Sequence, residues 1–181
     1  MNTLRNNVIA GTLAGMLISA GGIGYHLAQQ DEVLAYVIDG DSLALKSGEI
    51  VRLWGIDAPE IDQKCARTAG ELTAATAAIG WHCGRSAKRY LESFFKPQVR
   101  FKCERRGKDI YERTIAQCFA INLKGERHDI GKSLVAAGYA VDYERYSKGH
   151  YVADQKYASE HKLGLWGGGF INPEAWRAGH K

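Results

Sequence analysis

Two stretches of the chain place carboxylates at the ends of apolar runs. The segment "RLWGIDAPE", residues 52–60, passes from apolar residues to Asp57 and Glu60 around a proline, and "VIDGDSLAL" sets Asp39 and Asp41 on either side of a tight-turn glycine. A single carboxylate at a turn commonly does no more than face water. Two neighbouring strands that both end in acid favour a site in which the carboxylates act together.

The residue types around these carboxylates suit phosphodiester chemistry. Asp41 and Asp57 offer the hard oxygen ligands that a calcium ion accepts. Glu60, three residues further on, is placed to hold a water molecule, and Arg52 and Arg113 add guanidinium groups at the starts of two apolar runs. A metal and two arginines stabilise developing negative charge, and a glutamate orients or deprotonates water. Together these residues predict a metal-dependent phosphodiesterase.

Both arginines also have a purely structural interpretation. Arg52 lies among so many acids that a structural ion pair explains it equally well. Arg113 is also compatible with one more solvated surface charge. The residues alone leave these alternatives open.

The rest of the sequence describes one globular domain behind an apolar leader. The chain has 181 residues, of which 45% are hydrophobic and 24% are charged, a balance typical of one domain with an additional segment. Residues 6–30 contain no Asp, Glu, Lys or Arg, whereas Arg5 precedes them and two acids follow. We expect a signal peptide or membrane anchor over residues 1–30 and a globular domain over residues 31–181.

Whether this leader is cleaved stays open at this point. It is long enough to cross a bilayer, for which about 20 apolar residues suffice, but its glycines weaken the span, and Ala20-Gly21-Gly22 is a poor cleavage site. In either case the charge order places the following domain outside the cytoplasm. We expect a periplasmic or extracellular protein, or a domain held at the membrane through residues 1–30 where they are retained.

Four cysteines follow the leader and fit two disulfides. In an oxidising compartment, sequential pairing of Cys65 with Cys83 and of Cys103 with Cys118 is preferred among the three possible pairings. For the second pair, "VRFKCERR" and "RTIAQCFA" have the pattern of two strands of one hairpin, which would set the two cysteines opposite each other. Four buried free thiols are the alternative, and the wide spacing disfavours a zinc site.

The periodicity predicts an α+β fold. Strands are expected near residues 33–39, 41–46, 50–56, 98–104 and 113–121, and helices near residues 85–95, 129–137 and 152–163. Asp129 is a plausible N-cap for the second helix and Gly138 its stop. Five short strands followed by about three helices fit a five-stranded barrel of the OB type better than a sandwich or a parallel sheet.

Three of these stretches together resemble the signature blocks of the staphylococcal nuclease (thermonuclease) family. "VIDGDSLAL", "VRLWGIDAPE" and "DIYERTIAQC" occur in the family's order and at suitable distances, and "LVAAGYAVDY" and "KLGLW" are similar to its later helix and tryptophan blocks. The resemblance covers residues 33–177. The resemblance implies an OB-fold barrel with three helices. It also implies the activity of the family's secreted members, which use calcium to hydrolyse DNA and RNA.

The resemblance also implies roles for the acidic residues. Asp41 and Asp57 would ligate calcium, joined by the backbone carbonyl of Ala58. Glu60 would hold the attacking water and act as its base. Asp39 would support the metal site without touching the ion.

For the substrate, the resemblance implies a second set of residues. Arg52 and Arg113 would bind the scissile phosphate. Tyr111 is retained in the third block, and Tyr143 and Tyr146 fall near the tyrosines that stack on the nucleotide in the family. As plain residues, the last two are equally compatible with ordinary surface or core tyrosines.

The chain departs from the family at two places in these blocks. Ala58 stands where the best-known member has threonine, a change that a backbone ligand tolerates. Ile110 and Glu112 replace the lysine and the glycine of the usual Lys-Tyr-Gly-Arg stretch, which leaves Tyr111 and Arg113 in place.

We therefore predict an exported, calcium-dependent endonuclease that hydrolyses phosphodiester bonds in DNA, RNA or both, and that works as a monomer. The net charge of +4 is too small to demonstrate a nucleic-acid surface by itself. Basic residues on the predicted hairpin would suit single strands, whose bases stack on aromatic side chains, although a solvated hairpin tip is the alternative. The second class of function is an OB-fold module that binds nucleic acid or protein through a decayed site.

Overall fold

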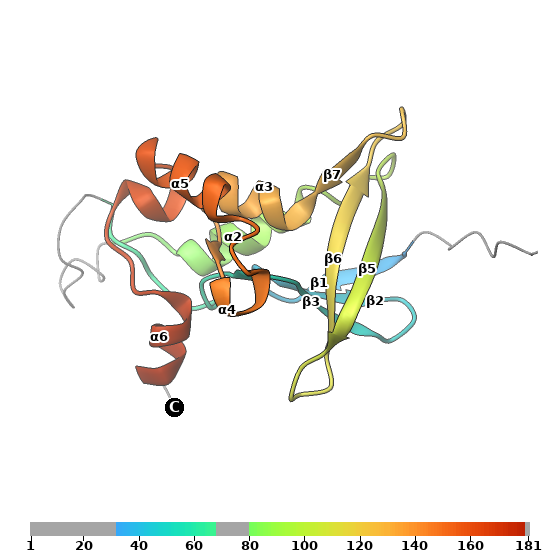
Figure 1. Ribbon diagram of the computed structural model, residues 1–181, viewed down its shortest axis with the longest axis horizontal. Coiled ribbons are helices and arrows are strands. Elements are labelled where there is room, and N and C mark those ends of the chain that lie inside the picture. Colours follow the sequence, from blue (N-terminus) through green and yellow to red (C-terminus); the bar gives the residue numbers. More distant parts are fainter. Residues whose placement is uncertain (1–31, 68–79, 180–181) are drawn as a thin grey trace, which may run out of the picture.

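The computed structural model describes residues 32–67 and 80–179. These residues form a mixed α+β fold in which a strongly twisted sheet lies beside a group of helices (Figure 1). The predicted leader over residues 1–30 lies outside this part of the chain. Across the described ranges, none of the helices combines the length and the apolar character that a membrane crossing requires.

The main sheet has six strands. From one edge to the other the order is β1-β2-β3-β6-β5, and β7 pairs with β6. The parallel pairing of β3 with β6 places Val51 opposite Thr114 and Arg52 opposite Ile115, whereas the other pairs are antiparallel. The bounds are β1 (Leu34–Val37), β2 (Ser42–Leu45), β3 (Ile50–Leu53), β5 (Arg100–Lys108), β6 (Thr114–Ile121) and β7 (Arg127–Asp129).

Helices and one small sheet complete the fold. Strand β4 (Ile56–Asp57) pairs with β8 (Val141–Asp142) and forms a separate two-stranded sheet. In the described part of the chain, the helices are α2 (Cys83–Glu92), α3 (Ile130–Ala136), α4 (Glu144–Ser147), α5 (Val152–Glu160), α6 (Pro173–Gly179) and the short 3₁₀ helix η1 (Gly164–Gly167).

The predicted strands and helices are present, but the predicted closed barrel is not shown. Strands β1, β2, β3, β5 and β6 and helices α2, α3 and α5 fall where the sequence placed them, and α4 and α6 are additional. Within the described residues, the only backbone pairing between the first strand region and β5 is an isolated bridge between Glu32 and Phe101. Strand β1 has four residues, and its pairing shifts between Leu34 and Tyr36, so it offers little edge for a continuous closing ladder.

The apolar core lies between the sheet and helices α2 and α3. Leu43, Val51, Leu91, Ile130 and Leu134 are fully buried there. Burial of such side chains contributes on the order of 2 kcal/mol each. This packing fixes the sheet against the helices and gives the functional residues a rigid support.

Helix α3 begins and ends as its sequence predicts. The Asp129 side chain accepts a hydrogen bond from the backbone N–H of Lys132 at 3.1 Å, which caps the first turn. Gly138 follows the helix with a φ of 72°, the left-handed conformation that glycine adopts without strain. Strand β8 follows Gly138 and pairs with β4, the strand that contains Asp57. The end of α3 therefore sets the position of β8 beside β4.

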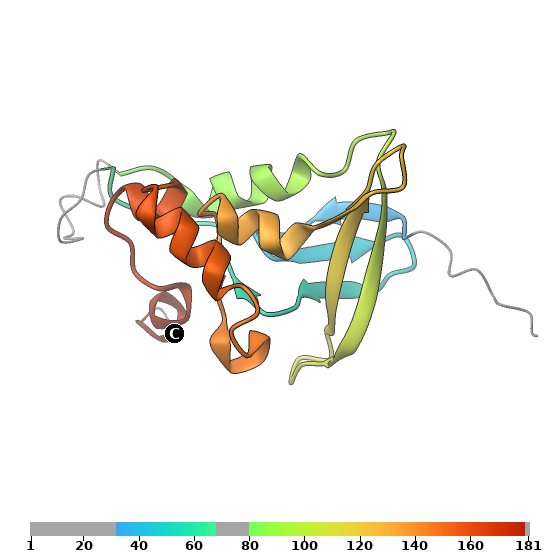
Figure 2. The same ribbon diagram turned by 45° about the horizontal axis from the view of Figure 1, so that its top comes forward.

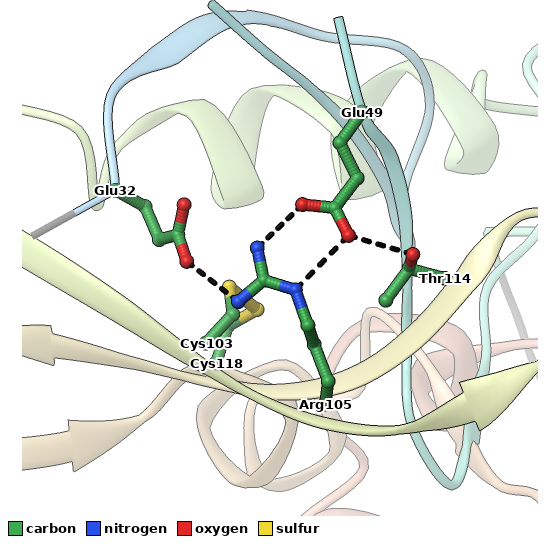
Figure 3. Close-up of a disulfide and its surroundings, with 6 residues drawn as sticks. All are labelled: Glu32, Glu49, Cys103, Arg105, Thr114 and Cys118. Carbon is green, nitrogen blue, oxygen red and sulfur yellow. Dashed lines mark hydrogen bonds and ion pairs between the residues drawn. A yellow bond between two sulfur atoms is a disulfide. The ribbon is translucent and has the colours of Figure 1, made fainter. Parts of the chain in front are cut away.

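Both expected disulfides are present, Cys65–Cys83 and Cys103–Cys118. The second joins directly opposed residues of β5 and β6, as the hairpin pattern predicted (Figure 3). Disulfides are typical of oxidising compartments. The pairing therefore agrees with an exported protein.

Near the second disulfide, Arg105 of β5 contacts two acids that lie just before β1 and β3 in the chain (Figure 3). Its Nε donates to Glu49 Oε1 at 3.0 Å and its Nη1 donates to Glu32 Oε1 at 2.9 Å. Glu49 also accepts a hydrogen bond from the Thr114 hydroxyl at 2.7 Å. This hairpin cation is thus engaged with two carboxylates in the fold.

Glu49→Gln is expected to lower the free energy of unfolding at neutral pH by about 0.5 kcal/mol, because the ion pair is partly exposed. The hydrogen bond from Arg105 outweighs burial and lowers the pKa of Glu49 from its ordinary value of 4.5. A lowered pKa means that this stabilisation is present above pH 4.5 and is lost as the pH falls through the folded-state pKa.

Urea unfolding at neutral and at strongly acidic pH measures this effect. The difference between the wild type and Glu49→Gln should vanish in acid. Glu160→Gln, on the exposed side of α5, serves as the matched control. A difference of the same size at both pH values would contradict the assignment.

Candidate functional site

The turn between β1 and β2 presents two of the predicted carboxylates. A Cβ at Gly40 would lie 2.7 Å from the Ala58 Cβ and 2.8 Å from the Ala87 Cβ, so glycine allows the turn to pack against both residues. The backbone N–H of Asp41 donates to Asp39 Oδ1 at 3.0 Å. This hydrogen bond holds the turn in the shape that directs Asp41 toward the residue after β4.

Arg52 joins the two predicted metal ligands. From β3, its Nη1 donates to Asp41 Oδ1 and its Nη2 donates to Asp57 Oδ1, the latter at 2.7 Å. The backbone N–H of Ala58 donates to Asp41 Oδ2 at 3.0 Å, and the Ser42 hydroxyl donates to Asp41 Oδ1 at 3.0 Å. The structure therefore brings together the carboxylates that the sequence placed at the ends of two strands.

Glu60 follows on a loop that is packed tightly against α2. Its backbone N–H donates to Gln63 Oε1 at 3.2 Å, and its carbonyl accepts from the Gln63 backbone N–H at 2.8 Å. A Cβ on Gly84 of α2 would lie 1.7 Å from the Glu60 carbonyl oxygen, a distance that excludes any larger residue. The loop is thereby fixed, and the Glu60 side chain lines the cleft described below.

We call Asp41, Asp57, Glu60 and their arginine partners the carboxylate cluster. Besides Arg52, it contains one arginine that the sequence analysis did not single out. Arg177, on α6, donates from Nη1 to Asp57 Oδ1 at 3.0 Å and from Nη2 to Asp57 Oδ2 at 2.9 Å. Its Nη1 also donates to Glu60 Oε1 at 2.9 Å. Burial alone would lower the pKa of Arg177, but the hydrogen bonds to Asp57 and Glu60 raise it overall.

A sequence signal existed for the helix that carries Arg177, but not for its contact. Asn172 precedes Pro173, and its side chain accepts from the Glu174 backbone N–H at 3.0 Å, a pattern typical of a helix start. The contact with Asp57 spans 120 residues of sequence. No local pattern reports a contact of that range.

Burial and mutual repulsion shape the electrostatics of the carboxylates. Burial, and after it the charge of Asp41, raises the pKa of Asp39 to about 6. Burial also raises the pKa of Asp57, although hydrogen bonds from Arg177 oppose that shift. A nearby cation would stabilise the ionised form of such buried carboxylates.

A cleft of about 650 Å³ opens beside the cluster. Figures 1 and 2 both show the tip of the β5–β6 hairpin, α4 and α6 on this side of the molecule. Asp41 and Asp57 do not line the cleft, because the cluster presents its arginines and Glu60 instead. The polar and aromatic lining residues are Asp39, Arg52, Glu60, Lys108, Asp109, Tyr111, Arg113, Tyr143, Tyr146 and Arg177.

Arg113 lies on the wall of this cleft, apart from the carboxylate cluster. Its Nε donates to Asp109 Oδ2 at 2.7 Å, and its guanidinium carbon lies 5.6 Å from the centre of the Tyr111 ring. Glu112 has a φ of 62°, the left-handed conformation that favours glycine. Glu112 therefore adopts with strain a backbone conformation that glycine adopts freely.

The three predicted tyrosines all line the cleft. Tyr111 is 73% exposed and Tyr146 is 46% exposed. The rings of Tyr143 and Tyr146 lie 5.0 Å apart, and the Tyr143 hydroxyl donates to Glu174 Oε1 at 2.8 Å. Exposed aromatic rings on a cleft are suited to stacking on bases.

The donors present suit a hard cation in type. Asp41 and Asp57 supply carboxylate oxygens held close together by Arg52, and the loop after Asp57 supplies backbone carbonyls, which are the ligands that calcium prefers. Within residues 32–67 and 80–179, no group of three or more His, Cys, Asp or Glu side chains is arranged to hold a metal. In this arrangement guanidinium groups provide the positive charge next to the carboxylates.

The chain is similar to known proteins over most of its length. A family model described as staphylococcal nuclease homologue matches residues 50–168, which include Arg52, Asp57, Glu60 and Arg113. The succinoglycan biosynthesis protein ExoI of Rhizobium meliloti (strain 1021) is 32% identical over 132 residues, 73% of this chain and 62% of that protein. The chain thus spans less than two thirds of this relative. Because the family model covers more than half of the chain, the chain belongs to the staphylococcal nuclease homologue family.

Proposed function

We propose that the protein is a calcium-dependent endonuclease that hydrolyses phosphodiester bonds in DNA, RNA or both. The observation that carries the proposal is the pair of buried carboxylates, Asp41 and Asp57, joined by Arg52 and flanked by Glu60 beside a cleft. The family membership supports a nuclease-type domain. The relative's name refers to succinoglycan biosynthesis, so the activity is argued from the site.

Asp41 and Asp57, with the backbone carbonyl of Ala58, are the residues that would hold calcium. The ion supplies positive charge beside the phosphate, where negative charge grows during hydrolysis. Asp39 holds the turn through its hydrogen bond to the Asp41 backbone, so its part is to keep Asp41 in place.

Glu60 is the residue that we assign to the water molecule. Its side chain lines the cleft three residues beyond Asp57, so it is available to hold a water molecule beside a bound strand. A carboxylate in this position orients the water and accepts its proton. Release of the Glu60 oxygen from Arg177 would make it available for this work.

The two arginines are assigned to the phosphate. A guanidinium group has five N–H donors, and Arg52 uses only some of them on Asp41 and Asp57, which leaves others for a phosphate oxygen. Arg113 approaches from the hairpin wall, where Asp109 fixes its orientation. Charge-assisted hydrogen bonds from both sides stabilise the charge that develops on the phosphate.

The cleft suits single-stranded nucleic acid. Tyr111 on one wall and Tyr143 and Tyr146 on the other offer rings for successive bases, which a duplex keeps stacked inside itself. Lys108 adds a further cation on the hairpin side. The two disulfides support a site of action outside the cytoplasm.

A second candidate is an OB-fold module that binds nucleic acid or protein and no longer cuts. One observation favours it: guanidinium groups from Arg52 and Arg177 already satisfy the Asp57 carboxylate. Against it, all the acids and arginines expected for catalysis are present: Arg52, Glu60 and Arg113 line the cleft, and Asp41 and Asp57 contact Arg52.

Incubation of the purified protein with end-labelled single-stranded DNA or RNA distinguishes these candidates. A calcium-dependent nuclease cuts in the presence of calcium and stops in excess EGTA. Retention of the strand in a mobility-shift assay without cutting would support the decayed module. Cleavage that continues undiminished in EGTA would reject the calcium mechanism.

A further inference from the structure

Helix α6 is held over the carboxylate cluster by polar contacts. Just before it, the carbonyl of Ile171 accepts a hydrogen bond at 2.7 Å from Nε2 of the fully buried Gln63. Within it, Glu174 accepts from the Tyr143 hydroxyl at 2.8 Å and lies 3.9 Å from Arg145. Glu174 and Arg177 are three residues apart and so share one face of the helix. That face is directed at the cluster.

Arg177 and Arg52 together occupy most of the oxygen lone pairs of Asp57. Asp57 accepts one N–H from Arg52 and two from Arg177, whereas a carboxylate offers about four acceptor positions. The Asp57 side chain is only 1% exposed, and Arg52 and Arg177, not Asp57, line the cleft. The one acceptor position that remains is buried behind these arginines, so a metal ion that reaches Asp57 from the cleft displaces one of the two guanidinium groups.

Of these two groups, Arg177 is the one that can leave. Arg52 lies on β3 in the middle of the sheet, between β2 and β6, and its side chain is 17% exposed. Arg177 lies near the end of a seven-residue helix, and its side chain is 33% exposed. Moving Arg52 would disturb the sheet, whereas moving Arg177 requires only that the polar contacts of α6 open.

The charges at the site agree with an exchange of one cation for another. The three acids that contact Arg52 or Arg177, namely Asp41, Asp57 and Glu60, carry three negative charges, and Arg52 balances one of them. The two charges that remain match a divalent cation. Arg177 neutralises part of that charge in the structure. At such short range its guanidinium group would repel a divalent cation strongly.

We propose that α6 is an autoinhibitory strap, in which Arg177 occupies the cation position on Asp57 and Glu60 and calcium must displace it. The strap rests on the calcium site of the proposed function. Docking of α6 and binding of calcium are then mutually exclusive, and each weakens the other by the same factor. Release of Arg177 also frees Glu60 and opens the cleft on the α6 side.

Calcium titration of the full chain by calorimetry tests the strap with two variants. Arg177→Gln removes the competing cation and should lower the calcium dissociation constant by about tenfold, within the usual range of coupled sites. Glu174→Gln loosens α6 from Tyr143 and Arg145 and should also tighten calcium binding. Simple long-range electrostatics predicts the opposite sign for Glu174→Gln, because that variant loses a negative charge. Arg127→Gln, on β7 away from the cleft, is the matched control.

Hydrogen exchange of the α6 amides gives a readout that is independent of activity. Calcium should speed exchange of the amides of residues 174–179 in the wild type, and Arg177→Gln should show fast exchange without calcium. In Asp41→Asn, which loses a proposed ligand but no contact with Arg177, calcium should leave α6 protected. Thermal unfolding checks each sample, and Glu174→Gln carries the test where Arg177→Gln does not fold.

The outcomes separate the strap from the function on which it rests. Wild-type binding that neither variant tightens, or calcium binding that leaves α6 protected, overturns the strap alone. Absence of calcium binding in both the wild type and Arg177→Gln overturns the calcium site and the strap together. Tighter binding in both variants, with faster exchange in α6, supports the strap.

Discussion

Asp57→Asn is expected to reduce calcium-dependent cleavage by at least about 100-fold, the scale seen when one preorganised charge-stabilising group is lost. Asp57 lies at the centre of the site. Its carboxylate accepts hydrogen bonds from Arg52 and Arg177, and the next residue, Ala58, donates its backbone N–H to Asp41. An amide keeps the shape but lacks the negative charge that a hard cation requires. Single-turnover cleavage of single-stranded DNA measures the loss.

Thermal unfolding in EGTA accompanies this measurement and establishes that the variant is folded. Asp154→Asn is the matched control, because Asp154 lies on α5, contacts Lys132 and is not part of the cleft. It should cut at the wild-type rate. Near-normal cleavage by folded Asp57→Asn would remove Asp57 from the metal site.

Arg113→Lys is expected to reduce turnover by about 100-fold as well, because lysine keeps the charge but not the planar fork that binds two phosphate oxygens. Calcium affinity should change little. Arg113 is fixed by Asp109, and in the described part of the chain no hydrogen bond joins it to Asp41 or Asp57. The measurement combines single-turnover cleavage with calcium titration of the same sample.

Arg127→Lys provides the control for this substitution. Arg127 pairs with Glu104 and lies over the Phe119 ring on another part of the sheet, so its replacement should leave cleavage unchanged. Arg52 is the less informative choice, since it also holds Asp41 beside Asp57. A folded Arg113→Lys that cuts normally would show that Arg113 has no catalytic role, and the strained Glu112 turn would then be the first feature to examine.

The proximity of Asp41 and Asp57 was predictable because it depends on local patterns. Asp41 precedes an apolar run, Asp57 follows one, and each lies at a turn signal. Gly40, beside Asp41, allows the close packing on Ala58. The Cys103–Cys118 pair followed for the same reason, because a hairpin sets directly opposed residues close together. Local chemistry and strand register were sufficient for these parts of the fold.

The parts that the sequence did not predict depend on long-range contacts. The parallel pairing that sets Arg52 opposite Ile115 joins strands that are separated in the chain by β4, α2 and β5. The contact of Arg177 with Asp57 spans 120 residues. In the sequence around Arg177, no local feature distinguishes this arginine from a solvated surface charge. Only the folded structure shows that it lies at the site.

The most direct test of the calcium-dependent nuclease is to cycle one protein sample through calcium, excess EGTA and calcium again while following cleavage of end-labelled single-stranded DNA. Cleavage should occur in calcium, stop in EGTA and return when calcium is restored, because binding of a ligand to the folded chain is reversible. Equal cleavage in all three stages, or none in any stage by a folded protein, would contradict the account.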